Sequence, residues 1–406
     1  MLKKIISVNV NKSPLDQPTP LHNRWHPDIP AVAHVKPGDA FRIECLDWTG
    51  GQIKDNDCAN DIRDVELDQV HYLSGPIAVE GAEPGDLLVV DILNIGPLYE
   101  SQWGFTGIFS KNNGGGFLTD YYPDAGKAIW DLEGIYATSR HIPDVRFAGI
   151  IHPGLIGTAP SHELLKEWNH RENILVSTNP DRIPPLACLP NSNAALCGQL
   201  TGDKLLEVAE TGARTVPGRE NGGNCDIKNL TRGSRAFFPV FIDGANLSMG
   251  DIHFSQGDGE ITFCGAIEMA GWIEIKVDLI KNGVSKYDIK NPIFLSSPLE
   301  PHYTEYITFE GISVDAQGKQ HYLNAHIAYQ NACLNAIAYL KKFGYTGEQA
   351  YMILSTAPVE GRISGVVDIP NAICTIYIPT SIFNMDIRPN HDGPIKNDRG
   401  QIALCS

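Results

Sequence analysis

Two segments near the N-terminus share one pattern, in which a Pro-Gly-Asp turn precedes a run of strand-forming residues. They are AHVKPGDAFRIECLDW (33–48) and EGAEPGDLLVVDILNI (80–95). Proline fixes φ at the first central position of a turn and glycine accepts positive φ at the second, so each segment predicts a tight turn that leads into a strand. We therefore interpret Asp39 and Asp86 as turn residues. Such pieces are typical of a β-sandwich or jelly roll.

The composition agrees with many turns and few long helices. Glycine and proline supply 39 and 27 of the 406 residues, which is about one residue in six, against a usual share of roughly one in eight. With 42% hydrophobic residues, the chain can bury a sizeable core. The expected fold is a β-rich α+β protein with parts like a jelly roll or β-sandwich and a few helices.

Helical periodicity appears in only a few places. HELLKEWNH, with Ser161 before it as N-cap, and GDKLLEVAET predict short helices, and the longest helix is expected near 321–343. A further short helix is expected from Thr346, and strands after it. The Gly- and aromatic-rich segment 98–145 shows no clear period; its loop 112–116 either covers a site or simply connects two elements.

We expect three parts that form one intertwined globular unit. The first is a β-rich N-terminal part with the Gly/aromatic loop (1–145), the second is a central part with the candidate site motifs (146–300), and the third contains the C-terminal helix and strands (301–406).

Charge and cysteine usage exclude several classes of protein. The net charge is −16 and no basic cluster stands out, so no nucleic-acid partner is expected. Nine scattered cysteines without a C-x-x-C pair fit neither a disulfide framework nor a thiolate zinc site. No 18-residue apolar run occurs, and the first residues lack a signal-peptide core, so we expect a cytoplasmic protein with no membrane partner.

The densest functional sequence is GDIHFSQGDGEITF (250–263). Alternate residues of a strand share a face, so a hairpin turning at 255–257 would bring Asp251 and His253 close to Asp258 and Glu260. Imidazole and carboxylate ligands suit Zn²⁺ or another divalent ion. The alternative is a polar hairpin tip whose carboxylates cap turn amides.

A second candidate segment is VPGRENGGNCDIKNL (216–230). Gly222 and Gly223 allow backbone amides to approach a ligand closely, and Asn224 and Asp226 alternate after them. Asp226 is either a ligand or a turn residue. Cys225 is the best cysteine candidate for a nucleophile, although the charge of its neighbour would raise the pKa of the thiol.

Two histidines complete the set. His152 ends an apolar strand before a Pro-Gly loop, and His71 is followed shortly by a Ser-Gly-Pro turn. Either imidazole could serve catalysis or simply hold its turn.

Several separate blocks, in this order, resemble the acetamidase/formamidase family over most of the chain, and the formamidase branch most. The blocks are HYLSGPI, VEGAEPGDLLVVDI, GIIHPGLIGTAPS, GGNCDIK, GDIHFSQGDGE, YMILSTAP and GVVDIPNAICTIYIP. The resemblance implies hydrolysis of formamide to formate and ammonia by a cytoplasmic homo-oligomer with a β-rich fold, and it implies that some members contain a metal.

These residues suggest a mechanism by metal-activated water. A divalent ion, expected to be zinc, would be held by Asp226, Asp251 and His253. Glu260, or otherwise Asp258, would move the proton. The groups expected to bind substrate or oxyanion are His152, Gly222, Gly223, Asn224 and His71, with Trp103, Phe105 or Tyr121 limiting substrate size. The alternatives are hydrolysis of another short amide, such as acetamide or a small lactam, and a non-catalytic β-sandwich with a metal-binding Ca²⁺ loop at 250–260.

Overall fold

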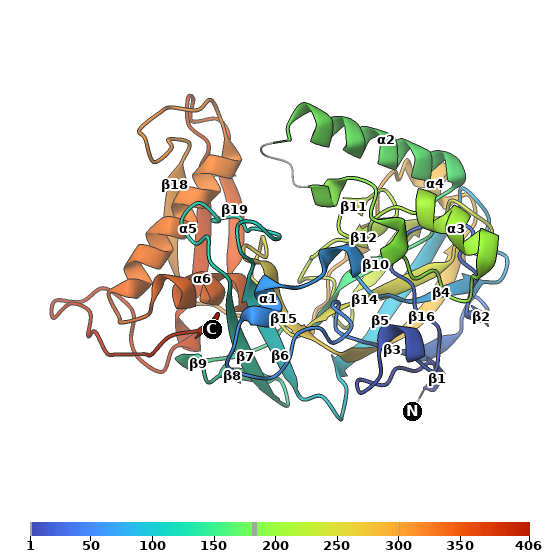
Figure 1. Cartoon of the computed structure of the whole chain (residues 1–406). Helices are drawn as coiled ribbons and strands as arrows, with labels where there is room; N and C mark the ends of the chain where they lie inside the picture. The colour runs from blue at the N-terminus through green and yellow to red at the C-terminus, as the bar shows by residue number, and fades with distance from the viewer. Residues whose placement is uncertain (1, 181–184, 300) are drawn as a thin grey trace.

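The strands form three β-sheets, described for residues 2–180, 185–299 and 301–406 in a computed structural model (Figure 1). The first sheet has six strands in the order β1 (Lys3–Ile6), β3 (Ala40–Cys45), β16 (Gly271–Ile280), β5 (Leu87–Pro97), β13 (Arg235–Pro239) and β17 (Ile293–Leu295).

The second sheet has twelve strands and contains the candidate site. Its main path runs β11 (Gly218–Arg219), β12 (Gly222–Asn224), β10 (His152–Gly157), β14 (Leu247–His253), β15 (Phe263–Met269), β6 (Trp103–Ile108), β7 (Gly126–Glu133), β8 (Tyr136–Ser139) and β9 (Ile142–Ala148). Three further strands attach to it: β2 (Ala33–Val35), β4 (Ser74–Val79) and β21 (Ala403–Leu404). The segment 98–145, which lacked a clear period, thus forms four strands of this sheet.

The third sheet consists of β18 (Tyr306–Ile312), β20 (Ile373–Pro379) and β19 (Glu360–Gly365). It lies with the two C-terminal helices at one end of the molecule, drawn in orange and red in Figure 1. The α-helices are α1 (Asn60–Arg63), α2 (His162–Thr178), α3 (Gly202–Thr211), α4 (Gly283–Tyr287), α5 (Ala325–Lys341) and α6 (Gly347–Thr356). Short 3₁₀ turns occur at Pro14–Asp16, Leu67–Gln69, Pro185–Ala187, Ser192–Ala194 and Thr380–Ile382.

The two Pro-Gly-Asp segments form the predicted turns and strands. Gly38 and Gly85 have φ values of 93° and 92°. The carboxylates of Asp39 and Asp86 each accept a hydrogen bond from the backbone N–H three residues earlier, at 2.8 and 2.9 Å. The strands that follow, β3 and β5, lie on either side of β16 in the six-stranded sheet. Both aspartates are therefore turn residues, as predicted.

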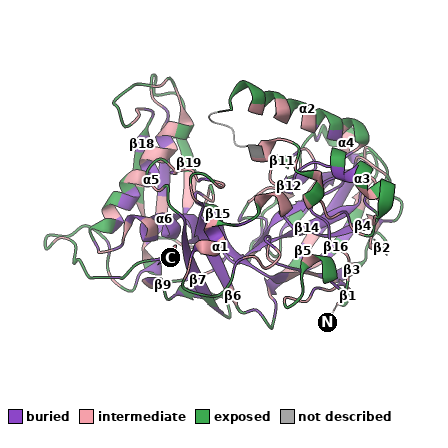
Figure 2. Cartoon of the chain, viewed as in Figure 1, coloured by how far each residue is buried: buried purple, intermediate pink, exposed green. Residues whose placement is uncertain are grey.

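The core lies between the six-stranded and twelve-stranded sheets. Ile43 and Ile275 from the first sheet and Ile77 and Met249 from the second belong to one cluster of buried apolar residues. Figure 2 shows that burial is concentrated in the strands, whereas α2 and α4 are largely exposed. The predicted β-rich class with sandwich-like packing and a few helices is confirmed.

The helix predictions hold with shifted ends. Ser161 caps α2 by accepting a hydrogen bond from the Leu164 N–H, and α2 runs eight residues beyond the predicted His170. The long helix begins at Ala325 rather than at 321, because Asn324 caps it and Leu323 has φ of 48°. Among the described residues, no helix combines the length and apolar character needed to cross a bilayer.

Candidate active site

The antiparallel strands β14 and β15 place three ionisable side chains together. Their register pairs His253 with Glu268, and Asp251 precedes His253 by two residues on β14. His253 Nε2 lies 3.1 Å from Asp251 Oδ1 and 3.0 Å from Glu268 Oε2. All three residues are buried, with at most 4% of their surface exposed.

Two loops add a second pair of carboxylates. Asp226 follows β12, and Glu260 lies in the connection between β14 and β15. Ligand atoms of Asp226, His253 and Glu260 lie within 4.8 Å of one another, as do those of Asp251, His253 and Glu268. His253 is therefore the centre of a group of five residues, which we call the His253 cluster: Asp226, Asp251, His253, Glu260 and Glu268.

The backbone is strained at three members of this cluster. Asp226, Asp251 and Glu260 have φ values of 48°, 53° and 44°. A non-glycine residue held in this region costs about 1–3 kcal/mol, and such residues are concentrated at functional sites because the surrounding fold must enforce them. The fold therefore holds these three carboxylates in position at a cost in folding free energy.

The cluster has an unbalanced charge. Burial, together with the charge of Asp251, raises the pKa of Asp226 to about 8 and that of Glu268 to about 7. Burial and the charge of Asp226 raise the pKa of Glu260 well above its usual value. Asp251 is the exception: although burial opposes ionisation, His253 lowers its pKa to about 2. One imidazole therefore faces more carboxylates than it can neutralise.

The donor atoms that converge here fit a divalent cation. Four buried atoms of this cluster make no hydrogen bond of good geometry within the described chain: Asp226 Oδ1, Asp251 Oδ1, His253 Nε2 and Glu268 Oε2. Gly154 leaves the space beside them open, because a Cβ at this position would lie 2.5 Å from His253 Cε1 and 2.7 Å from Asp251 Oδ2. One imidazole with several carboxylates is a ligand set that suits Zn²⁺ and similar ions.

Gln256 fixes the orientation of His253. Its Oε1 accepts a hydrogen bond from His253 Nδ1 at 2.9 Å and lies 3.0 Å from His152 Nε2, and its Nε2 donates to the Asp226 carbonyl at 2.7 Å. Because Nδ1 of His253 carries the donated proton, Nε2 is the atom turned toward the carboxylates. This is the outer-shell arrangement that orients histidine ligands.

A cavity of about 480 Å³ opens onto the His253 cluster. Asp226, Asp251, Glu260 and Glu268 line it, together with His71, Asn224 and Cys225. Much of the remaining lining is apolar and includes Trp48, Phe109, Leu186, Val216 and Phe263. The cavity therefore joins a polar, ionisable region to an apolar one.

Two of the expected substrate-binding residues lie at this cavity. Thr215 Oγ1 is 3.1 Å from His71 Nδ1, and His71 Nε2 lies 4.0 Å from Asp251 Oδ2. Burial lowers the pKa of His71, so the ring is neutral. Asn224 lines the cavity, and its buried Oδ1 has no hydrogen-bond partner in the described chain. Both side chains are available to orient a polar substrate.

Other expected site residues lie outside the cavity lining. His152 stands behind His253, with ring centroids 5.1 Å apart, and burial lowers its pKa to about 3. Asp258 forms an ion pair with Lys228 at 2.6 Å and accepts a hydrogen bond from Gly361 N at 2.9 Å. The loop from 254 to 262 is longer than the expected turn at 255–257, so Asp258 points toward β19.

Gly222 and Gly223 serve close strand packing. They belong to β12 and pair with Gly157 and Ile156 of β10, and neither lines the cavity. A Cβ on Gly222 would lie 2.6 Å from the Ile156 carbonyl oxygen. Small size and positive φ are required here by the neighbouring strand.

Cys225 lines the cavity, but its surroundings disfavour the thiolate. Burial, followed by the charge of Asp226, raises its pKa to about 12. Since the thiolate is the nucleophilic form, these surroundings disfavour Cys225 as a nucleophile.

Sequence reasoning missed Glu268 and Gln256. A signal for Glu268 exists, because it is a single carboxylate inside the apolar run Ala266–Ala270, where a buried charge needs a partner. Of the aromatic segment, Phe109 and Gly114 line the cavity, whereas Trp103, Phe105 and Tyr121 do not.

Comparisons with known proteins show the family to which the chain belongs. The family model described as acetamidase/formamidase matches residues 7–385. A formamidase of Methylophilus methylotrophus is 67% identical over 393 residues, covering 97% of each chain. An acetamidase of Mycolicibacterium smegmatis is 62% identical, covering 89% of this chain and 91% of the relative. The solved structure of a gamma lactamase from Delftia acidovorans is 60% identical, with a TM-score of 0.97 and full coverage of both chains. The chain therefore belongs to the acetamidase/formamidase family, as its sequence blocks predicted.

Proposed function

We propose that this protein is a formamidase, which hydrolyses formamide to formate and ammonia at the His253 cluster. The observation that carries the proposal is a cavity bounded by ionisable groups that include Glu260, in a chain 67% identical to a formamidase. Formamide is neutral, so the net charge of −16 has no role in attracting it.

Amide hydrolysis requires a proton to move from water to the departing nitrogen. Glu260 lines the cavity, and burial and the charge of Asp226 raise the pKa of its carboxyl, which makes the carboxylate a stronger base. Its carboxylate would accept a proton from the attacking water as the C–O bond forms, and would return that proton to nitrogen as the C–N bond breaks. The products, formic acid and ammonia, account for all atoms of amide and water.

Two further side chains would orient the amide. Asn224 Oδ1 lacks a partner in the described chain and would accept a hydrogen bond from the substrate NH₂ group. The neutral ring of His71 can donate from Nε2, because the Thr215 hydroxyl faces its Nδ1, and would stabilise the carbonyl oxygen as negative charge develops.

We further propose that the cluster holds a divalent ion, with zinc as the best match. The buried atoms of Asp226, Asp251, His253 and Glu268 that make no hydrogen bond within the described chain would hold it. When bound, such an ion supplies a water of lowered pKa and polarises a carbonyl. An imidazole at the centre of the ligand set argues against the alternative of a non-catalytic Ca²⁺ loop, because Ca²⁺ takes oxygen ligands.

A second candidate function is hydrolysis of larger amides, including small lactams. A cavity of about 480 Å³ corresponds to about sixteen waters at the liquid share of about 30 Å³ each, whereas formamide has only three non-hydrogen atoms. The apolar lining, with Trp48, Phe109 and Phe263, could receive an acyl group. The family relatives include proteins described as an acetamidase and a gamma lactamase.

Ammonia release from formamide, acetamide and propionamide, together with ring opening of a five-membered lactam to its amino acid, tests both candidates. The proposal predicts the highest kcat/KM for formamide. Highest efficiency on the lactam would favour the second candidate, and no hydrolysis of any of the four compounds with Zn²⁺ present would contradict both.

The proposal includes a cytoplasmic homo-oligomer. All nine cysteines are free, which agrees with a reducing compartment. Edge strand β17 exposes Ile293 and Leu295 by 50% and 63%, and such apolar side chains support contact with another copy. Sedimentation of the purified protein tests the assembly: a single species of 44.4 kDa would contradict it.

A further inference from the structure

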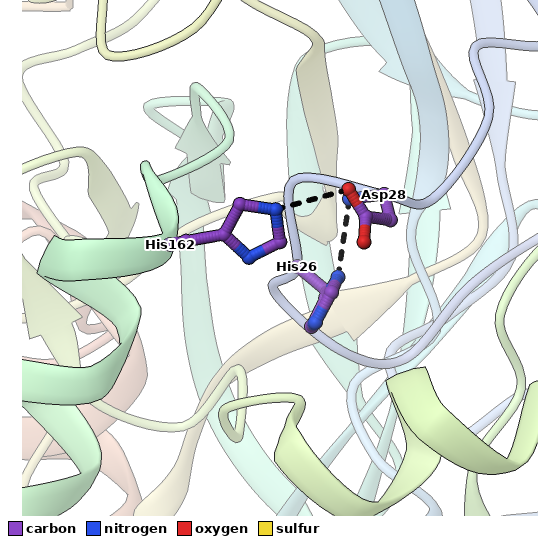
Figure 3. A group of neighbouring side chains, drawn as sticks. All are labelled: His26, Asp28 and His162. Atoms are coloured by element: carbon purple, nitrogen blue, oxygen red, sulfur yellow. Dashed lines mark hydrogen bonds and ion pairs between the residues drawn. The ribbon is translucent and has the colours of Figure 1, made fainter. Parts of the chain in front are cut away.

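A second group of metal-ligand side chains lies outside the cavity (Figure 3). His26 and Asp28 belong to the loop after the first 3₁₀ turn, and His162 is the first residue of α2. Ligand atoms of the three residues lie within 4.8 Å of one another. In Figure 3 both imidazole rings meet Asp28, one from the loop and one from the helix. None of the three residues lines the cavity at the His253 cluster.

The two chain segments that carry these residues are held firmly. Trp25, next to His26, packs in one buried cluster with Leu165 and Trp168 of α2. Trp25 also exchanges two backbone hydrogen bonds with Ala213, each of 3.0 Å. Because both segments are anchored by buried contacts, the loop and the helix present their histidines in a fixed relationship, as a metal site requires.

The hydrogen bonds of His26 leave one ring nitrogen unprotonated, and the lone pair of that nitrogen faces the backbone N–H of Asp28. His26 Nε2 lies 3.1 Å from Thr211 Oγ1, and that hydroxyl already donates to the Glu207 carbonyl at 2.9 Å. The hydroxyl must therefore accept the Nε2 proton, so Nδ1 is the unprotonated nitrogen. Nδ1 lies 3.1 Å from the backbone N–H of Asp28. A donated Nε2–H that fixes the tautomer is the usual support of a histidine ligand.

The other two donors are accessible from solvent. His162 Nε2 lies 3.2 Å from Asp28 Oδ1, and their side chains are 61% and 34% exposed. The ring of His162 meets that of His26 edge to face, with centroids 5.6 Å apart. A simple surface ion pair would explain why Asp28 and His162 lie close together. It does not explain why the buried ring of His26, with its fixed tautomer, lies beside them. An ion can reach all three donors without opening the core.

We propose that His26, Asp28 and His162 form a second metal site, for Zn²⁺ or a divalent ion with similar ligand preference. Two imidazoles and one carboxylate suit Zn²⁺, Co²⁺ or Ni²⁺, whereas Ca²⁺ and Mg²⁺ prefer oxygen ligands alone. On binding, His26 Nδ1 exchanges its contact with the Asp28 N–H for the ion, and water takes over that N–H. The ion joins the N-terminus of α2 to the loop and thereby stabilises the fold.

Zn²⁺ titration of the chelator-treated full-length protein, followed by calorimetry, tests the proposal. His162→Ala should bind one equivalent of Zn²⁺ fewer than wild type, and Asp28→Asn should bind at the same site at least about tenfold more weakly. Zn²⁺ should raise the melting temperature of both proteins, and the rise should be larger for wild type than for His162→Ala. The matched control is His170→Ala, which removes another exposed histidine of α2 and should retain every equivalent.

The result is distinguishable from failure of the metal proposed at the His253 cluster. If that cluster binds no Zn²⁺, wild type still binds one equivalent and His162→Ala binds none. Metal-loaded His162→Ala should hydrolyse formamide within about twofold of wild type, because His162 lies outside the cavity. Equal stoichiometry and affinity in wild type and His162→Ala would overturn the second site.

Discussion

His253 and Glu268 face each other across strands β14 and β15, with His253 Nε2 3.0 Å from Glu268 Oε2. The two residues are 15 positions apart in sequence, and only the antiparallel register brings them together. This pair, with Asp251 beside it, forms the buried end of the His253 cluster and joins the cluster to the twelve-stranded sheet.

The first prediction concerns Glu268, which sequence reasoning did not find. Glu268→Gln keeps the shape of the side chain but removes one charge, so both Zn²⁺ affinity and kcat on formamide should fall. The loss should exceed the 10–100-fold typical of removing an outer-shell partner. Zn²⁺ binding and steady-state rates measure it. Unchanged affinity together with unchanged kcat would exclude Glu268 from the site.

The second prediction concerns the cavity thiol. Cys225→Ser should retain kcat within about threefold, because burial and Asp226 raise the pKa of the thiol to about 12 and the wild-type residue is not ionised near neutral pH. Treatment of wild type with iodoacetamide at pH 7 should leave Cys225 unmodified by mass spectrometry. A loss of several orders of magnitude in Cys225→Ser would instead identify a nucleophile.

The third prediction separates Asp258 from Glu260. Asp258 pairs with the buried Lys228, whose side chain is 5% exposed, so Asp258→Asn should lower the free energy of unfolding by about 1–2 kcal/mol. Its kcat should stay within a few-fold of wild type. Urea unfolding and rate measurements on the same preparation test this, with the exposed Asp278→Asn as control. A large fall in kcat at unchanged stability would return Asp258 to the catalytic machinery.

The fourth prediction is a pH dependence of stability. Burial lowers the pKa of His22 from 6.5 to about 4, against the opposing hydrogen bond to the Arg24 carbonyl. Below pH 6.5 the unfolded chain takes up a proton that the folded chain does not take up until about pH 4. The free energy of unfolding should therefore fall as pH decreases from about 6.5 to 4, by up to about 3 kcal/mol from this residue.

His22→Gln should make this part of the stability profile flatter than in wild type, as measured by urea unfolding between pH 4 and 7. The exposed His34→Gln is the control and should follow the wild-type profile. Identical slopes in wild type and His22→Gln would rule out the buried neutral state of His22.

The sequence predicts local features of this fold well and distant relationships poorly. The Pro-Gly-Asp turns and the cap at Ser161 depend on a few adjacent residues, and the structure confirms them. Strand alternation also places Asp251 and His253 together. In contrast, Glu268 joins them through strand register, which no pattern within 250–263 contains.

Two glycines and two histidines show a related limit of prediction from sequence. The Gly222–Gly223 pair suggests close approach, and close approach occurs, but to β10 rather than to a ligand. His152 and His71 have similar settings in the sequence, yet His71 lines the cavity and His152 supports Gln256 from behind. Which side of a sheet faces a cavity depends on elements far away in the chain.

The central claim is that Glu260 moves the proton during amide hydrolysis, and Glu260→Gln tests it most directly. Glutamine retains the oxygen that accepts the Gly265 N–H at 3.1 Å, so the loop should keep its structure. The measurement is kcat for ammonia release from saturating formamide, with Zn²⁺ content determined on the same samples. The account predicts a fall of about 10²-fold or more at unchanged melting temperature. A kcat within a few-fold of wild type would contradict it.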